Sequence, residues 1–78
     1  MPRKIKLIWD FRGPNAQETA KHHVVHLNEY AQIEKLSFES IETESVSDYF
    51  AMAFMIVNEN DMLQIRDALK PHRGVVVQ

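Results

Sequence analysis

The segment 49-YFAMAFMIV-57 lies in the longest stretch of the 78-residue sequence without a charged side chain, residues 49–58. In an extended chain, successive side chains point to opposite sides. One side would carry Tyr49, Ala51, Ala53, Met55 and Val57, and the other Phe50, Met52, Phe54 and Ile56. Both sets are apolar, which is typical of a strand buried on both faces in the middle of a sheet. This segment therefore predicts the central strand of the fold.

A second strand is predicted over residues 4–11, where apolar and mostly polar side chains alternate. Ile5, Leu7, Trp9 and Phe11 share one side, and Lys4, Lys6, Ile8 and Asp10 the other. This period of two indicates one core face and one mostly polar face. Arg12, Gly13 and Pro14 end the strand, and Pro14 suits the first turn of a helix because its missing N–H is not needed there.

The longest predicted element is a helix from Asn15 to about Lys35. Its apolar stripe consists of Ala16, Ala20, Val24, Leu27 and Ala31, with His23 and Tyr30 on the border. The spacing matches the helical period, and Val25 falls on the solvent side. Its alanines would let the helix lie close to a sheet.

Three further elements follow from the remaining pattern. A short polar edge strand is predicted over 40–44, where Glu39, Glu42 and Glu44 would discourage pairing with another sheet, and a turn over 45–48. A second helix is predicted from a cap at Asn58 to Lys70, with Met62, Ile65 and Leu69 as its stripe and Pro71 after its end. Residues 75–77 would form a short last strand.

The predicted order is β-α-β-β-α-β within a single domain, residues 1–78. Short connections and right-handed crossovers favour the α+β ferredoxin-like sandwich, a four-stranded antiparallel sheet with both helices on one face. The first and third strands are then central. The pattern leaves open which side of the third strand faces the helices.

Composition narrows the function classes. The absence of cysteine excludes disulfides, thiolate metal sites and cysteine nucleophiles. Nine basic and eleven acidic residues give a net charge of −2, which argues against nucleic-acid binding. No segment is long enough to span a membrane, and the apolar start is too short and interrupted for a signal peptide, so we expect a cytoplasmic protein without a membrane partner. No cofactor motif is found, and no cofactor is predicted.

The segment 22-HHVVH-26 holds three of the four histidines. His22 and His26 are four residues apart, so both imidazoles leave one flank of the helix, at the spacing of a two-nitrogen metal site. The third ligand of such a site has only distant candidates. Solvated histidines are the simpler interpretation, and weak chelation by His22 and His26 is the expected behaviour. His23 would lie at the core border.

The turn after the first strand is the other candidate site. A small anion would find Arg12, Gly13 and the free N–H groups of the helix start there, flanked by Asp10 and His23. Asp10 opposes strong anion binding, because it would pair with Arg12. The simpler interpretation is therefore an ordinary turn with an Asp10–Arg12 surface pair.

Residues 5–27, with Trp-Asp-Phe-Arg-Gly-Pro followed by His-His-x-x-His, resemble a motif of small bacterial proteins with a ferredoxin-like build, a group without a named activity. In topology alone the chain is also similar to the dimeric α/β-barrel proteins and to small-ligand regulatory domains. The resemblance implies a fold and not a function.

Three functions are consistent with these features. A non-enzymatic homodimeric binding module is favoured. A monomer seldom exposes an apolar patch like the second side of the third strand, and two-fold self-association would bury it. The alternatives are a small dimeric α/β-barrel-type enzyme with a helix histidine as its acid or base, and a metal-binding protein using His22 and His26.

Overall fold

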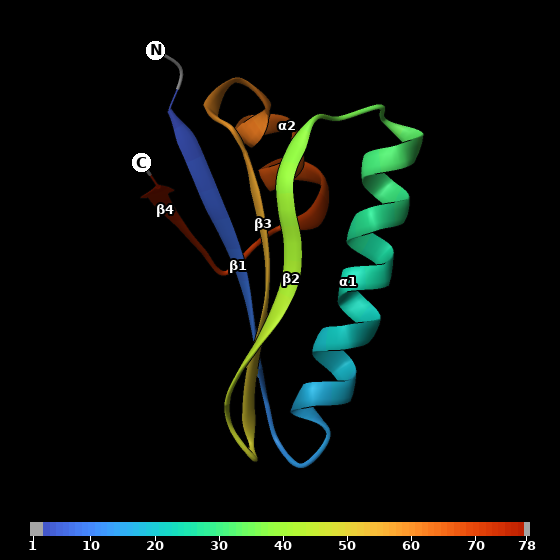
Figure 1. Ribbon diagram of the computed structural model, residues 1–78, viewed down its shortest axis with the longest axis vertical. Coiled ribbons are helices and arrows are strands. Elements are labelled where there is room, and N and C mark those ends of the chain that lie inside the picture. The colour runs from blue at the N-terminus through green and yellow to red at the C-terminus, as the bar shows by residue number, and fades with distance from the viewer. Residues whose placement is uncertain (1–2, 78) are drawn as a thin grey trace.

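A computed structural model describes residues 3–77 and contains the six predicted elements in the predicted order. In chain order they are β1 (Lys4–Arg12), α1 (Ala16–Ile33), β2 (Phe38–Ser47), β3 (Phe50–Asn58), α2 (Glu59–Leu69) and β4 (Arg73–Val77) (Figure 1). The sheet has the order β2-β3-β1-β4, and every pair of neighbours is antiparallel. The ferredoxin-like α+β prediction is therefore confirmed, with β1 and β3 at the centre of the sheet.

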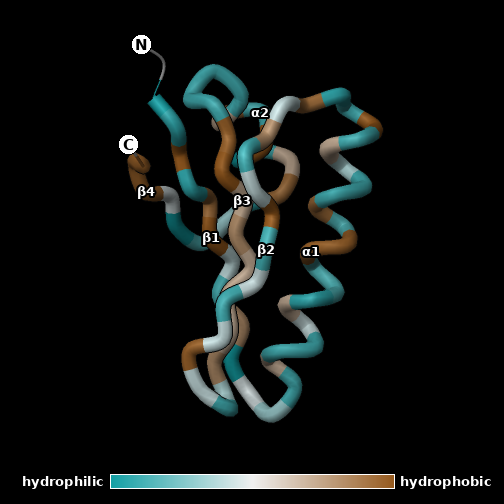
Figure 2. Tube along the Cα trace, viewed as in Figure 1, coloured by the Kyte–Doolittle hydropathy of each residue, from teal (hydrophilic) through white to brown (hydrophobic). Residues whose placement is uncertain are grey.

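The structure also decides which side of β3 faces the helices. Ala51, Ala53, Met55 and Val57 lie on this helix face and are buried, whereas Phe50, Met52, Phe54 and Ile56 lie on the opposite, open face and are half-buried. The small side chains of Ala51 and Ala53 allow a helix to approach the strand closely. Figure 2 shows the apolar character of β3, in contrast to the mixed hydropathy of β2.

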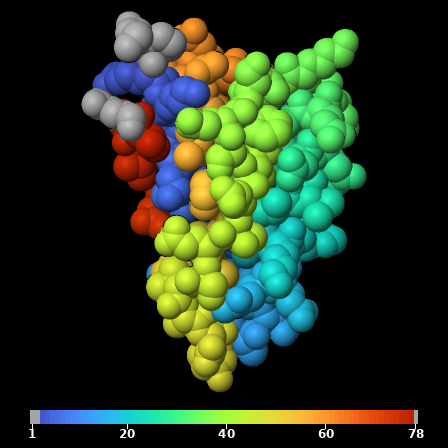
Figure 3. Space-filling model, viewed as in Figure 1, coloured from blue at the N-terminus to red at the C-terminus, as the bar shows by residue number. Residues whose placement is uncertain are grey.

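The long helix α1 packs across β1, β2 and β3. The predicted stripe is confirmed: Ala16, Ala20, Leu27 and Ala31 are buried, and Val24 packs against them. Val25 is 54% exposed, as its place on the helix predicts. The two space-filled elements α1 and β2 lie side by side along their length in Figure 3. Neither helix in the described part of the chain, residues 3–77, is long and apolar enough to cross a membrane.

The shorter helix α2 packs on β3 and β1 but, among the described residues, not on β4. Ile65 is fully buried, with Met62 and Leu69 partly buried beside it, as predicted. Asn58 holds the N-cap position, as predicted, but its side chain makes no capping hydrogen bond. Instead the Glu59 N–H donates to the carbonyl of Arg3 (2.9 Å), so the residue before β1 holds the start of α2.

The edge strand β2 is longer than the predicted segment 40–44, and the turn expected over 45–48 is reduced to Asp48 and Tyr49. Pairing with β3 continues to Ser47, with register shifts near both ends of β2. The side chain of Gln17 on α1 donates to the Ser45 hydroxyl and to the Ser47 carbonyl (3.1 Å). These hydrogen bonds hold polar residues in a strand, which their turn-like composition did not indicate.

Candidate functional site

The open face of the sheet combines three bands of side chains. Register partners in an antiparallel pair point to the same face, so the pairing defines this surface row by row. Its first band, on β1 and β4, carries Lys4, Lys6, Arg12 and Arg73, with Asp10 and Ile8 among them. Its middle band is the apolar row on β3, and its third band carries Glu39, Glu42 and Glu44 on β2. A basic and an acidic band thus flank an apolar one.

Two cations of the basic band lie over aromatic rings of the apolar band. The Lys6 Nζ is 4.3 Å from the ring centre of Phe54, and the Arg12 guanidinium carbon is 4.1 Å from that of Phe50. Such contacts are attractive because the ring face is electron-rich. Among the ion pairs of residues 3–77, neither Lys6 nor Arg12 has a carboxylate partner. Both cations can therefore be redirected towards an incoming acidic group.

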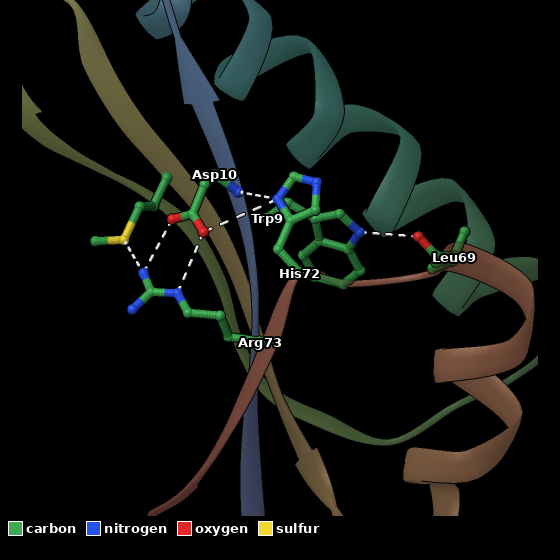
Figure 4. A network of polar contacts seen from close by, with 6 residues as sticks. Trp9, Asp10, Leu69, His72 and Arg73 are labelled. Atoms are coloured by element: carbon green, nitrogen blue, oxygen red, sulfur yellow. Dashed lines mark hydrogen bonds and ion pairs between the residues drawn. The ribbon is translucent and has the colours of Figure 1, made fainter.

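A second group of contacts joins β4 to β1 and β3 (Figure 4). The Arg73 side chain donates to both carboxylate oxygens of Asp10, at 2.9 and 3.2 Å, and to the Met52 sulfur at 3.0 Å. The Asp10 side chain is only 20% exposed, so the bidentate pair is partly shielded from water. Arg73 thus fastens three adjacent strands on the open face.

His72 extends this network along the edge of β1. Its N–H donates to the Ile8 carbonyl (2.9 Å), and its ring Nδ1 accepts the backbone N–H of Asp10 (2.7 Å). An accepting Nδ1 carries no proton, so the bond requires the tautomer with hydrogen on Nε2. The imidazole therefore replaces the backbone partner that β4, which pairs with β1 only from Lys4 to Ile8, does not provide at Asp10.

His23 lies on the other side of the sheet, where α1 covers the end of β1. Its ring centre is 5.0 Å from that of Trp9 and 5.4 Å from that of Phe11, and its Nε2 is buried with no hydrogen-bond partner among the described residues. Burial lowers the pKa of His23 below its ordinary 6.5, and the nearby charges of His26, His72 and His22 act in the same direction. His23 is therefore held neutral at pH 7.

The four residues predicted around an anion site do not converge. Asp10 and Arg12 point to the open face, whereas His23 packs on the helix face, because alternate strand residues point to opposite sides. Gly13 lies in the turn at φ 120°, where its N–H donates to the Tyr49 carbonyl (2.9 Å). The expected Asp10–Arg12 pair is not formed within residues 3–77, because the Asp10 carboxylate is paired with Arg73 instead.

His22 and His26 do share one flank of α1, as their spacing predicts. Their ring centres are 4.7 Å apart in an edge-on arrangement, and the His26 Nδ1 lies 3.6 Å from a Glu29 carboxylate oxygen. Across residues 3–77, no group of three or more His, Asp or Glu side chains is placed to hold a metal ion. The pair on its own offers two nitrogens, fewer than the protein ligands of a zinc site.

His72 and Arg73 are the hydrogen-bond partners of Asp10, and the sequence did not predict either contact. They follow Asp10 by more than sixty residues, and neither lies in a recognisable motif. The predicted topology places the last strand beside the first. Only the register, with Arg73 opposite Ile8, brings these side chains to Asp10, and no periodicity specifies that register.

The chain matches no known protein family, no curated protein and no solved structure. Its function is therefore inferred from the arrangement of its own side chains.

Proposed function

We propose that this chain is a non-enzymatic interaction module that forms a homodimer through the open face of its sheet. The observation that carries the proposal is the three-band pattern of this face, with an apolar band on β3 between a basic and an acidic band. A surface of this kind is complementary to a second copy of itself.

The apolar band supplies the attraction. Phe50, Met52, Phe54 and Ile56 are large side chains on a face that neither helix covers. Within one chain they are covered only in part, by Lys6 and Arg12 lying over two of the rings. Burying them fully against another sheet would remove apolar surface from water, at roughly 25 cal/mol per Å².

The charged bands select one arrangement of the two copies. Two sheets that face each other are related by a two-fold axis lying between them. An axis along β3 places the basic band of one copy over the acidic band of the other, whereas an axis across the strands places like charges together. Opposite charges across an interface favour the first arrangement, in which the two β3 strands run in the same direction. Lys6 would then lie level with the partner's Ser40, one row from the partner's Glu42, and Arg12 level with the partner's Ser47, one row from the partner's Glu44.

The polar network at Asp10 supports a binding role over catalysis. The Asp10 carboxylate is held by Arg73, and His72 accepts the Asp10 N–H. The Asp10 carboxylate and the His72 Nδ1 are therefore already engaged in holding neighbouring strands together. The buried His23 likewise faces two aromatic rings.

The oligomeric state tests this proposal. Sedimentation of the untagged chain at micromolar concentration should give twice the 9.1 kDa chain mass. The variant Phe54→Glu should be monomeric, because it places a charge in the centre of the apolar band. Val25→Glu, at an exposed site on α1, is the matched control and should remain dimeric. A monomeric wild-type chain at high micromolar concentration would reject the proposal, and circular dichroism would verify that both variants fold.

Cross-linking tests the arrangement. Since the chain has no cysteine, a single introduced thiol can form a disulfide only with the same thiol of a second molecule. With β3 strands running in the same direction, Met52→Cys and Ile56→Cys should each form an intermolecular disulfide. With opposite directions, residue 52 would face residue 56 of the other copy, and only Phe54→Cys would cross-link. That second result would exclude the arrangement that the charges favour.

A further inference from the structure

A hollow of about 330 Å³ lies on the helix face of the sheet, between α2 and β4. It exists because α2 packs on β3 and β1 and leaves β4 uncovered, and because Gly74 contributes no side chain there. Its floor is formed by Ile5 and Leu7, with Val76 beside them, and Met62 stands on its α2 side. The volume is at the lower end of the roughly 300–1,000 Å³ of small-molecule pockets. The hollow is thus apolar at its base and suited to a small ligand.

The polar groups at the rim of this hollow are all basic. Arg66 and His72 stand at this rim, the Arg73 side chain turns away to Asp10 on the open face, and no carboxylate of residues 3–77 lines the hollow. Arg73 is engaged by Asp10, and His72 by the Asp10 N–H. Among the side chains of residues 3–77, Arg66 pairs only with its exposed neighbour Asp67, with 3.5 Å between Nε and Oδ1. The guanidinium of Arg66 therefore has donors to spare beside an apolar floor.

The hollow has an apolar end and a basic end, which follow from the chain directions of α2 and β4. In the β3–α2–β4 crossover, α2 and β4 run in opposite directions (Figure 1). The early helix residue Met62 therefore lies towards Val76, and Arg66, one turn later, lies towards Gly74. We infer that the hollow binds a small carboxylate with an apolar tail, the tail against Met62 and Val76 and the carboxylate at Arg66. This site lies on the opposite side of the sheet from the proposed dimer interface and does not depend on it.

The test is an NMR titration with octanoate as the probe. Two control ligands each keep one part of octanoate. Acetate has the head without the tail, and octanol has the tail without the charge. In a ¹⁵N-labelled chain, octanoate should shift the amide signals of Leu7, Met62, Arg66, Gly74 and Val76. Acetate should shift none of them, and octanol should bind at least tenfold more weakly, because a charge-assisted hydrogen bond is lost.

Two variants address the two ends of the hollow. Gly74→Val should abolish binding by filling it. A Cβ at this position would lie 3.5 Å from Leu7 Cδ2 and 3.7 Å from Ile5 Cγ2, which is ordinary contact, and Gly74 does not have a positive φ, so the variant should fold. Arg66→Gln should weaken octanoate binding about tenfold and leave octanol binding unchanged. Leu63→Gln, at an exposed site on α2 that does not line the hollow, is the matched control and should bind as the wild type.

Three results would overturn the inference. The first is an absence of shifts at these five amides with millimolar octanoate. The second is unchanged octanoate binding by Gly74→Val, which would place the ligand elsewhere. The third is equal binding of octanoate and octanol, since it would remove the carboxylate from the recognition. Sedimentation of the same variants keeps the two proposals separate, because neither Gly74→Val nor Arg66→Gln alters the open face.

Discussion

The two sides of β3 are both apolar, but they are covered in different ways. On the helix face, Ala51, Ala53, Met55 and Val57 are at most 2% exposed under the two helices. On the open face, the larger Phe50 and Phe54 are covered in part by the charged side chains of Arg12 and Lys6. The helix face is therefore a completed core, whereas the cover of the open face can be rearranged. The two alanines of β3 lie on the covered face, and its two aromatic rings lie on the open face.

The largest expected effect is on the completed core. Leu27 of α1 is fully buried, so Leu27→Ala should lower the free energy of unfolding by about 2–5 kcal/mol through lost burial and a residual cavity. Val25→Ala, two residues away and exposed, should change it by less than about 0.5 kcal/mol. Urea denaturation measures both, and similar losses at the two positions would contradict the assigned orientation of α1.

An intermediate effect is expected at the network that fastens the open face. Removing Arg73 leaves the partly buried Asp10 carboxylate without its bidentate partner. Arg73→Gln should therefore lower the free energy of unfolding by about 1–2 kcal/mol. A double-mutant cycle with Asp10→Asn isolates the pair, and additive losses in the cycle would mean that the two side chains do not interact.

A smaller effect is expected where a cation covers a ring. Arg12→Gln removes the contact with Phe50 and should cost about 0.5–1 kcal/mol, the range for cation–π contacts at exposed sites. Lys21→Gln, on an exposed part of α1, serves as the control. If the two variants unfold at the same urea concentration, Arg12 does not stabilise the open face of the monomer.

The smallest effect is a dependence on pH at the border of the helix face. Because burial lowers the pKa of His23, the unfolded chain binds a proton there before the folded chain does. The free energy of unfolding should therefore fall as the pH falls below 6.5, until the lower folded pKa has been passed. Well above pH 6.5 the residue is neutral in both states and contributes no slope.

The variant His23→Leu isolates this contribution. Leucine suits the space between Trp9 and Phe11 and removes the buried Nε2 that has no partner. Urea denaturation at a series of pH values should give a shallower slope below pH 6.5 for the variant than for the wild type. An unchanged slope would assign the pH dependence to other groups.

The fold could be predicted further than the site. The uncharged run at β3 and the stripe of α1 are periodic features, and periodicity reports burial directly. The alternation of side chains along a strand likewise predicts that Asp10 and Trp9 point to opposite faces of the sheet. Alternation alone cannot say which side of β3 is covered, because both of its sides are apolar. The small size of Ala51 and Ala53 was the available signal for the covered side.

The candidate site depends on pairings that periodicity does not encode. Arg73 reaches Asp10 because β4 pairs with β1 in one particular register, and a shift by one residue would turn the arginine to the other face. The length of β2 was missed for a related reason. Its serines and glutamates are paired by β3 and by Gln17 of α1, both of which are distant in the sequence.

The strand order described above also has a consequence for how the chain reaches its native state. Of the four strands in the described residues, only β2 and β3 are neighbours both in the sequence and in the sheet, and a two-residue connection joins them. The central strand β1 has its partners at residues 50–58 and 73–77. Closing such long loops costs entropy before any contact compensates for it, which slows folding. We therefore expect the β2–β3 hairpin to form early against α1, and β1 and β4 to join the sheet in the late, rate-limiting step.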